Sequence, residues 1–312
     1  MACSTKEESS STGALLMKWF LVFIGMLIAG LLAKSLYALQ DSDDLLHIIF
    51  CDVGQGDAIL ISYHFSQVII DSGRDEQVLS CLWQYMPMGD RELELVVATH
   101  PDADHIGGMP FIFDQFGVKQ LLVPPVRKET ADFIALEQAV SRETELQFPP
   151  VVAETGVEIG LDGVVTMRVF APQSAKRPEA ILSDFSEYIS VNDGGANDWS
   201  IVLYLSFKQF SALFSGDLEA KGELALLSDG LLDDVDLLKV AHHGSKSSTT
   251  ADFLKVIRPE ISVVSVGKNN SYGHPSPQII DLLEETGSLI LRTDESGSVH
   301  IVSDGKNYWV AK

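Results

Sequence analysis

The sequence has few cysteines and few basic residues, and each shortage narrows the classes of protein that it can encode. Its three cysteines, Cys3, Cys51 and Cys81, show neither CxxC spacing nor an even-numbered framework, which argues against a disulfide-rich scaffold. Cys51 lies in an apolar run, so we interpret it as a small buried hydrophobic residue. A disulfide between Cys51 and Cys81 is the less favoured alternative.

The shortage of bases leaves a strongly acidic chain. Lys and Arg total 22 against 44 acids, for a net charge of -22. A surface of this sign repels phosphates, which argues against tight, sequence-reading DNA binding. It does not exclude phosphoester cleavage, because bound metal ions would supply a positive field.

One long apolar stretch follows a polar tail at residues 1–12. It runs from Gly13 to Leu39 and is uninterrupted from Trp19 to Ala33. With Lys18 reaching toward the headgroups, the stretch is long enough to cross a bilayer core. We therefore predict a transmembrane signal anchor at residues 13–39, with the N-terminal tail inside and residues 40–312 outside the cytoplasm. A cleaved signal peptide and a buried soluble helix are the alternatives.

Residues 40–312 contain no linker and no internal repeat, so we expect a single domain. Short apolar strands come first, and strands mixed with helices follow, without a strict βαβ repeat. This order predicts an α+β domain in which packed sheets are covered by helices. A loop is expected from Pro172 to Ala196, which is rich in Ser, Asp, Asn and Gly.

A dense set of metal-ligating residues follows the strand expected at Glu92 to Thr99. Four candidate ligands fall within six residues: His100, Asp102, Asp104 and His105. Imidazole and carboxylate are common ligands for zinc and related ions. Gly107 and Gly108 would let the backbone turn tightly into a helix expected at Ile106 to Phe116.

Two further motifs stand at strand ends and carry the same chemistry. Asp217 follows the strand expected at Ser211 to Phe214, and His242 and His243 follow the one at Val235 to Ala241. Either motif alone would be weak evidence, since aspartate after glycine is usually a turn residue. Together with the first motif, they predict one metal site.

These motifs resemble the metallo-β-lactamase superfamily, and most closely the C-terminal domain of the ComEC competence proteins. The residues that carry the resemblance are Asp52–Asp57, Asp71–Gly73, His100–Gly108, Ser215–Glu219, His242–Ser245 and Tyr272–Pro275. The resemblance implies an αββα sandwich with the site at one edge between the sheets.

The resemblance also implies a ligand set. His100 and Asp102 would hold a first metal, Asp104, His105 and His243 a second, and Asp217 would bridge them. Two departures matter. Asp102 stands where the wider superfamily has histidine, and the usual isolated histidine is missing, so Asn197 or Asp198 would take its place. The first site is then rich in oxygen, which favours manganese or magnesium beside zinc.

The leading functional hypothesis is a membrane-anchored hydrolase that cleaves phosphodiesters, with DNA among the candidate substrates and one or two zinc ions as cofactor. Water activated by the metals' field would attack phosphorus, and Asp104, His242 and His274 form the candidate catalytic group. His242 would protonate the leaving oxygen or merely support its neighbour, and His274 would contact substrate or shape a turn. Asp57 and Asp71 would orient ligands or cap turns, whereas Lys239, Lys246 and Arg74 are expected on the surface.

Two alternatives remain open. The first is an exported esterase that acts on phosphocholine or other esters of the cell envelope, which suits an anchored external domain equally well. The second is a metal-poor binding module on a retained fold.

Overall fold

The computed structural model describes residues 17–32, 44–143, 146, 149–172, 189–190 and 195–311. The chain divides into two compact units, Met1–Asp43 and Asp44–Lys312. In the first unit, residues 17–32 form a helix. No helix within the described ranges combines the length and apolar character needed to span a bilayer. The remainder of the expected anchor, the tail at residues 1–12 and most of the expected loop at 172–196 lie outside the described residues.

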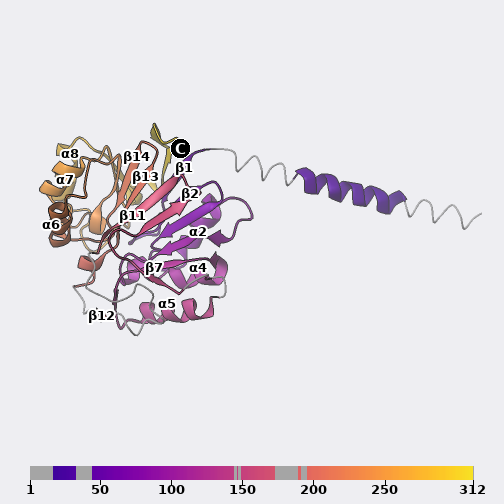
Figure 1. Cartoon of the computed structure of the whole chain (residues 1–312), viewed down its shortest axis with the longest axis horizontal. Coiled ribbons are helices and arrows are strands. Elements are labelled where there is room, and N and C mark those ends of the chain that lie inside the picture. The colour runs from indigo at the N-terminus through magenta and orange to yellow at the C-terminus, as the bar shows by residue number, and fades with distance from the viewer. Residues whose placement is uncertain are drawn as a thin grey trace, which may run out of the picture. The chain divides into compact units, whose positions relative to one another are not determined.

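Two large sheets form the second unit (Figure 1). The first has eight strands in the order β19 (Tyr308–Val310), β18 (Val299–Ser303), β1 (Leu46–Phe50), β2 (Ile59–Tyr63), β3 (Ser66–Ile70), β5 (Leu95–Val97), β7 (Leu121–Val123) and β9 (Val151–Val152). The second has seven, in the order β10 (Glu158–Leu161), β11 (Val165–Ala171), β13 (Val202–Phe207), β14 (Phe210–Phe214), β15 (Leu237–Lys239), β16 (Ile261–Val264) and β17 (Leu289–Arg292). Two short pairs complete the strands, β8 (Val126–Arg127) with β12 (Ile189–Ser190), and β4 (Glu92–Leu93) with β6 (Gly117–Val118).

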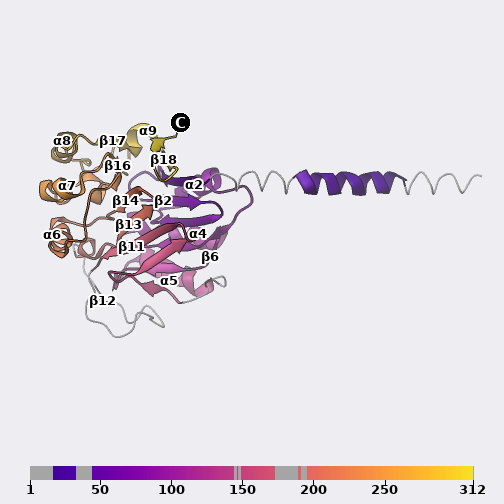
Figure 2. The same cartoon turned by 45° about the horizontal axis from the view of Figure 1, so that its top comes forward.

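Helices cover the outer face of each sheet. The first sheet packs on α2 (Gln77–Tyr85), α4 (Met109–Gln115) and α5 (Ala131–Arg142). The second packs on α6 (Ala220–Asp229), α7 (Ala251–Ile257) and α8 (Pro277–Glu285), which lie together in both views (Figures 1 and 2). Shorter helices are α3 (Ala103–Ile106), α9 (Thr293–Ser296) and the 3-10 helices η2 (Asn197–Trp199) and η3 (Ala241–Gly244).

Alternation along the strands produces this layering. In β1, Leu46, Ile48 and Phe50 enter the core between the two sheets, whereas Ile49 enters the core beneath the helices. The side-chain period of two in a strand places these residues on opposite faces. Both faces are buried from Ile48 to Phe50, which is why β1 is apolar apart from His47. The expected α+β sandwich of four layers, αββα, is confirmed.

The parallel strands bring the site together. β3 and β5 run parallel, as do β14, β15 and β16, so their carboxyl ends reach the same edge of each sheet. Asp71 follows β3, the His100 motif follows β5, and Asp217 and the His242-His243 pair follow β14 and β15. The strand-end motifs thus meet where ligands commonly lie in sheets of this kind.

Several local predictions were wrong. Cys51 and Cys81 form a disulfide, because β1 and α2 bring their Cα atoms to 5.8 Å. The helix expected at Ile106 to Phe116 is broken into α3 and α4 at Gly107 and Gly108. An added Cβ at Gly108 would lie 2.2 Å from the Ser72 carbonyl oxygen, so the chain passes too close there for any other residue.

Candidate metal centre

One carboxylate oxygen lies at the middle of the site. Asp217 Oδ2 is 3.3 Å from His105 Nε2, 3.5 Å from His243 Nε2, 3.8 Å from His242 Nε2 and 3.9 Å from His100 Nε2. His100, His105, His243 and Asp217 are all buried. Four imidazoles from two strand-end motifs therefore converge on the aspartate that was expected to bridge two metals.

The opposite ring nitrogen of each buried histidine is held by the protein. His105 Nδ1 lies 2.7 Å from Asp71 Oδ2, and His243 Nδ1 donates to the Ser265 carbonyl oxygen at 2.8 Å. His100 Nδ1 lies 3.1 Å from Thr99 Oγ1, which itself donates to Asp71 Oδ2 at 2.6 Å. This network favours the Nδ1–H tautomer, in which the Nε2 lone pair faces the site.

These lone pairs fit a metal ion. Among the described residues, the Nε2 atoms of His100, His105 and His243 are buried and have no hydrogen-bond partner. A buried polar atom left without a partner is costly, and a cation would satisfy all three at once. Among the four groups of described residues whose ligand atoms lie close enough to hold an ion, two contain these free nitrogens and overlap at His105: His100 with His105 and Asp217, and Asp104 with His105 and His243.

The two remaining aspartates of the first motif differ in their partners. Asp104 Oδ2 lies 3.6 Å from His243 Nε2, on the side of the second group. Asp102 Oδ2 lies 4.0 Å from His100 Nε2, but its Oδ1 pairs with Lys128 Nζ at 2.5 Å. Lys128, which the sequence did not single out, therefore shares the carboxylate expected to complete the first metal position.

Asn197 lies nearer the site than Asp198. Asn197 Nδ2 is 3.5 Å from His242 Nδ1 and 3.5 Å from Glu219 Oε1. Asp198 instead pairs with Lys221 at 2.9 Å. Glu219 was not among the candidates, although its Oε1 lies 3.4 Å from His242 Nδ1. His242 thus stands between two carboxylates, with Nε2 toward Asp217 and Nδ1 toward Glu219.

His274 joins the edge of the site. Its ring centroid is 5.8 Å from that of His242, and Tyr272 stacks on its other side at 5.9 Å. Asn270 fixes the backbone, since its Oδ1 accepts from His274 N at 3.1 Å. Burial, together with the neighbouring His242 and His243, lowers the pKa of His274. The turn therefore presents a histidine that favours its neutral form beside the imidazole cluster.

Lys239 was expected on the surface, but its side chain is fully buried. Its Nζ forms an ion pair with Asp57 Oδ2, lies 3.5 Å from Asp217 Oδ1 and donates to the Gly216 carbonyl oxygen at 2.8 Å. Burial opposes its charge, but Asp57 and Asp217 outweigh burial and raise its pKa. A charged residue within the apolar run Leu237 to Val240 was the signal for a buried pair. Arg74 and Lys246 are exposed, as expected.

The backbone at His242 and His243 has a strained conformation that turns both side chains toward Asp217. His242 and His243 have φ values of 49° and 53° inside η3, a left-handed conformation that is uncommon outside glycine. Asp71 also has a positive φ of 58°. Such strain gathers at functional sites when the surrounding fold enforces it. Here it lets His242 and His243 both face Asp217 Oδ2.

Protonation differs among the buried histidines. Burial, reinforced by His105, lowers the pKa of His100 to about 4. Burial also opposes the charged form of His243, but Asp217 and Asp57 outweigh it and raise its pKa to about 10. A proton therefore competes with a metal ion for His243 Nε2, whereas His100 offers its lone pair at neutral pH.

Comparison with known proteins agrees with this geometry. Residues 51–173 match the model of the metallo-beta-lactamase superfamily, a range that includes Asp57, Asp71 and the His100 motif. The chain is 27% identical over 271 residues to ComE operon protein 3 of Bacillus subtilis, covering 80% of this chain and 32% of that protein. It is 25% identical over 284 residues to competence protein ComA of Neisseria gonorrhoeae, covering 88% of this chain and 34% of that protein. The chain thus spans about a third of the length of these relatives.

Solved structures are more distant. The metallo-beta-lactamase fold protein YhfI from Bacillus subtilis has a TM-score of 0.47 at 13% identity, covering 80% of this chain and 96% of that one. A putative metal-dependent hydrolase from Parabacteroides distasonis has a TM-score of 0.45 at 13% identity, covering 80% and 93%. The family resemblance read from the motifs is confirmed by the family model and the sequence relatives. The chain is therefore similar to the metallo-beta-lactamase superfamily over residues 51–173, and a competence protein is among its sequence relatives.

Proposed function

We propose that this protein is a metal-dependent hydrolase that cleaves phosphodiesters. The observation that carries the proposal is the convergence of four imidazole Nε2 atoms on Asp217 Oδ2, three of them buried without a hydrogen-bond partner in the described chain. A structural site would close its ligands around the ion. Here His242 is partly exposed, so one side of the cluster is open to a substrate.

The donor set supports zinc, with manganese or magnesium as alternatives. His105, His243, Asp104 and Asp217 would form the nitrogen-rich second position. His100, Asp102 and Asn197 would form the oxygen-rich first position, which suits harder ions. A bound divalent ion would supply positive charge that polarises a phosphoryl oxygen and lowers the pKa of a nearby water.

The protein's own residues would handle the proton of the leaving group. His242 Nε2 faces the cluster, and Glu219 lies 3.4 Å from its Nδ1. A carboxylate in this position orients the ring toward the cluster, where a general acid would have to stand. His274, stacked beside Tyr272, would line the approach of the substrate together with Asp104.

Phosphodiesters are favoured over other esters by the chemistry of the centre and by its relatives. Two metal positions about one bridging carboxylate suit an in-line displacement at phosphorus. One relative carries the name competence protein, which keeps DNA among the candidate substrates despite the net charge of -22.

Metal content and turnover, measured in the same samples of the full chain, test the proposal. Wild type should hold one or two equivalents of metal and hydrolyse bis-(p-nitrophenyl) phosphate. Asp217→Ala should lose both, whereas Asp252→Ala, which removes an exposed carboxylate on α7, should lose neither. Metal-loaded wild type that hydrolyses phosphocholine esters and leaves phosphodiesters intact would refute the substrate class. Absence of metal and turnover after zinc and manganese reconstitution would indicate a binding module.

We further propose that residues 13–39 anchor the protein in a membrane, with the hydrolase domain outside the cytoplasm. Apolar side chains such as Trp19, Phe23 and Leu31 are more than half exposed on the helix at residues 17–32, which suits a lipid environment. The Cys51–Cys81 disulfide favours an oxidising compartment. The full chain should stay with membranes in alkaline carbonate, and a form lacking residues 1–43 should not. Release of the full chain by carbonate would refute the anchor.

A further inference from the structure

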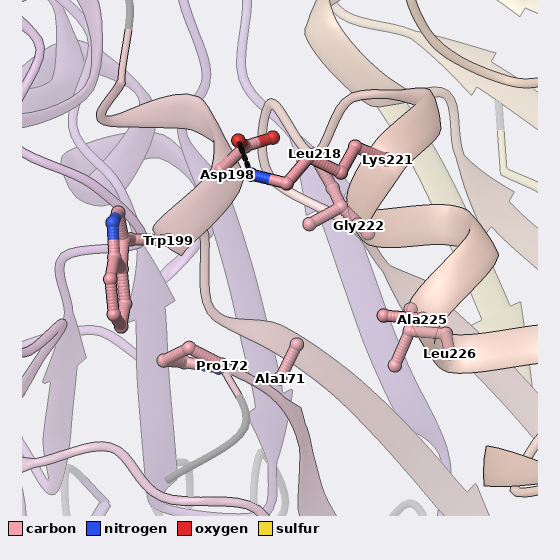
Figure 3. A pocket seen from close by; sticks show the side chains of 9 residues that line it. All are labelled: Ala171, Pro172, Asp198, Trp199, Leu218, Lys221, Gly222, Ala225 and Leu226. Atoms are coloured by element: carbon pink, nitrogen blue, oxygen red, sulfur yellow. Dashed lines mark hydrogen bonds and ion pairs between the residues drawn. The ribbon is translucent and has the colours of Figure 1, made fainter. Parts of the chain in front are cut away.

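A pocket of about 250 Å³ lies between η2 and α6 (Figure 3). Its apolar wall is formed by Pro172, Leu218, Gly222, Ala225 and Leu226, and Trp199 forms the facing wall. Asp198 and Lys221 pair at 2.9 Å across one side. The pocket therefore combines a mostly apolar interior with one charged pair, as small-molecule sites commonly do.

The pocket shares two stretches of chain with the metal centre. In η2, Asn197 faces His242 at 3.5 Å, while the next two residues, Asp198 and Trp199, line the pocket. After β14, Asp217 faces the imidazoles while Leu218 lines the pocket. Ser200 Oγ accepts from Asp217 N at 3.1 Å and joins the two stretches. A group bound in the pocket would therefore lie beside the cluster.

Trp199 gives the pocket a flat face. Figure 3 shows the indole edge-on, with its plane turned toward Ala225 and Leu226 across the pocket. A planar ring placed there would stack on the indole and contact aliphatic groups on its other side. Stacking on an aromatic side chain is how bases are commonly held without sequence preference.

We propose that this pocket binds the base of a nucleotide next to the scissile phosphodiester, an inference that rests on the proposed function. The Asp198 carboxylate offers an acceptor for an amino group of the base. Lys221, whose side chain is 84% exposed, offers a cation to an adjoining phosphate.

A choline headgroup fits the pocket less well. Quaternary ammonium groups are recognised by cages of several aromatic rings. Of the described residues that line this pocket, Trp199 is the one aromatic, and Lys221 already pairs with the Asp198 carboxylate that a cation would need. The lining thus favours a neutral planar ring over choline.

Base selectivity in hydrolysis is the first test. KM would be measured for a short single-stranded DNA and for the same oligomer with abasic sites, using the metal-loaded full chain. The wild-type ratio of abasic to base-bearing KM should be about tenfold, within the range expected for one stacked base. It should fall to about one in Trp199→Ala and survive in Trp199→Phe. Trp83→Ala, which removes a distant, partly exposed tryptophan, should keep the wild-type ratio.

Binding without turnover separates this inference from the proposed function. With divalent ions chelated, adenosine monophosphate should quench tryptophan fluorescence in wild type and Trp83→Ala, and much less in Trp199→Ala. If hydrolysis fails in every variant but this difference persists, the phosphodiesterase proposal falls and the base pocket stands. Equal quenching in Trp199→Ala, or equal binding of phosphocholine and adenosine monophosphate, would overturn the base pocket.

Discussion

Lys239 Nζ lies 3.5 Å from Asp217 Oδ1, while the other oxygen of the same carboxylate faces the four imidazoles. Both side chains are buried. One carboxylate therefore joins two cationic environments, a permanent one from the chain and one that a metal would supply. The effect of the Lys239 charge on the stability of this centre can therefore be measured by replacing Lys239.

Replacing Lys239 by methionine should lower the free energy of unfolding of the metal-free protein by about 3–5 kcal/mol. The substitution leaves Asp57 and Asp217 buried without their cation, which is the costly way to break a buried pair. Urea denaturation with and without zinc measures it, and zinc should restore part of the loss. Lys255→Met, at an exposed pair on α7, should change stability by under about 1 kcal/mol. A similar, small change in the free energy of unfolding of both variants would show that Lys239 does not stabilise the buried carboxylates.

Replacing Asp71 by asparagine should weaken metal binding about 10- to 100-fold, the usual effect of losing a carboxylate that orients a histidine ligand. Asparagine tolerates the φ of 58° at this position, so the backbone should remain in place. Competition with a chromophoric chelator measures the affinity. Asp162→Asn, at another positive-φ aspartate, serves as the control. Unchanged affinity in Asp71→Asn would mean that His105 needs no such partner.

Gly56 and Gly54 offer a matched pair in the loop that approaches the metal motif. A Cβ at Gly56 would lie 2.1 Å from the Asp104 carbonyl oxygen, whereas a Cβ at Gly54 meets nothing within 4 Å. Both have positive φ, 70° at Gly54 and 133° at Gly56, so alanine is strained at both positions, by about 1–3 kcal/mol each. Gly56→Ala should in addition displace Asp104 and reduce bound metal at least tenfold. Equal metal content in the two variants, measured after gel filtration, would show that the close approach is not needed.

The Cys51–Cys81 disulfide closes a loop between residues 30 apart in sequence. Chain-entropy reasoning gives about 3–4 kcal/mol for a loop of this size. The Cys51→Ser, Cys81→Ser double variant should lose that much free energy of unfolding. A reducing agent should destabilise wild type by the same amount and leave the double variant unchanged. A reductant effect that persists in the double variant would contradict this account.

His300 should make stability depend on pH. Burial, with His47 beside it at 3.0 Å, lowers the pKa of His300 to about 4, against about 6.5 in an unfolded chain. Between about pH 4 and pH 6.5, His300 is protonated in the unfolded chain but neutral in the folded protein. The contribution of neutral His300 to the free energy of unfolding is therefore fully present above about pH 6.5 and is lost as the pH falls toward 4. Urea midpoints from pH 7.5 to 5 should fall less steeply in His300→Gln than in wild type or His64→Gln. Parallel slopes in all three would rule this out.

The sequence predicted the features that depend on short stretches of chain. Residues at strand ends, such as His100, Asp217 and His243, could be found because a strand and the ligand after it are neighbours in sequence. The helix α2 was missed, although its buried Val78, Cys81 and Leu82 show the i, i+3, i+4 spacing of a short amphipathic helix.

What could not be predicted depends on pairing between distant segments. The burial of Lys239 requires Asp57 from the loop after β1, and the disulfide requires β1 and α2 to pack together. Lys128 meets Asp102 only because β8 returns beside the metal motif. Spacing along the chain carries no information about such contacts, so Lys239 was assigned to the surface and Lys128 was not singled out.

The buried ammonium of Lys239 also bears on whether folding or metal binding comes first. Small zinc domains remain unfolded until the ion arrives, because metal binding supplies the free energy of their folding. Here two buried carboxylates already have a covalently attached counter-charge, within a core that spans both sheets. We therefore expect the chain to fold before it binds metal and to stay folded when the metal is removed.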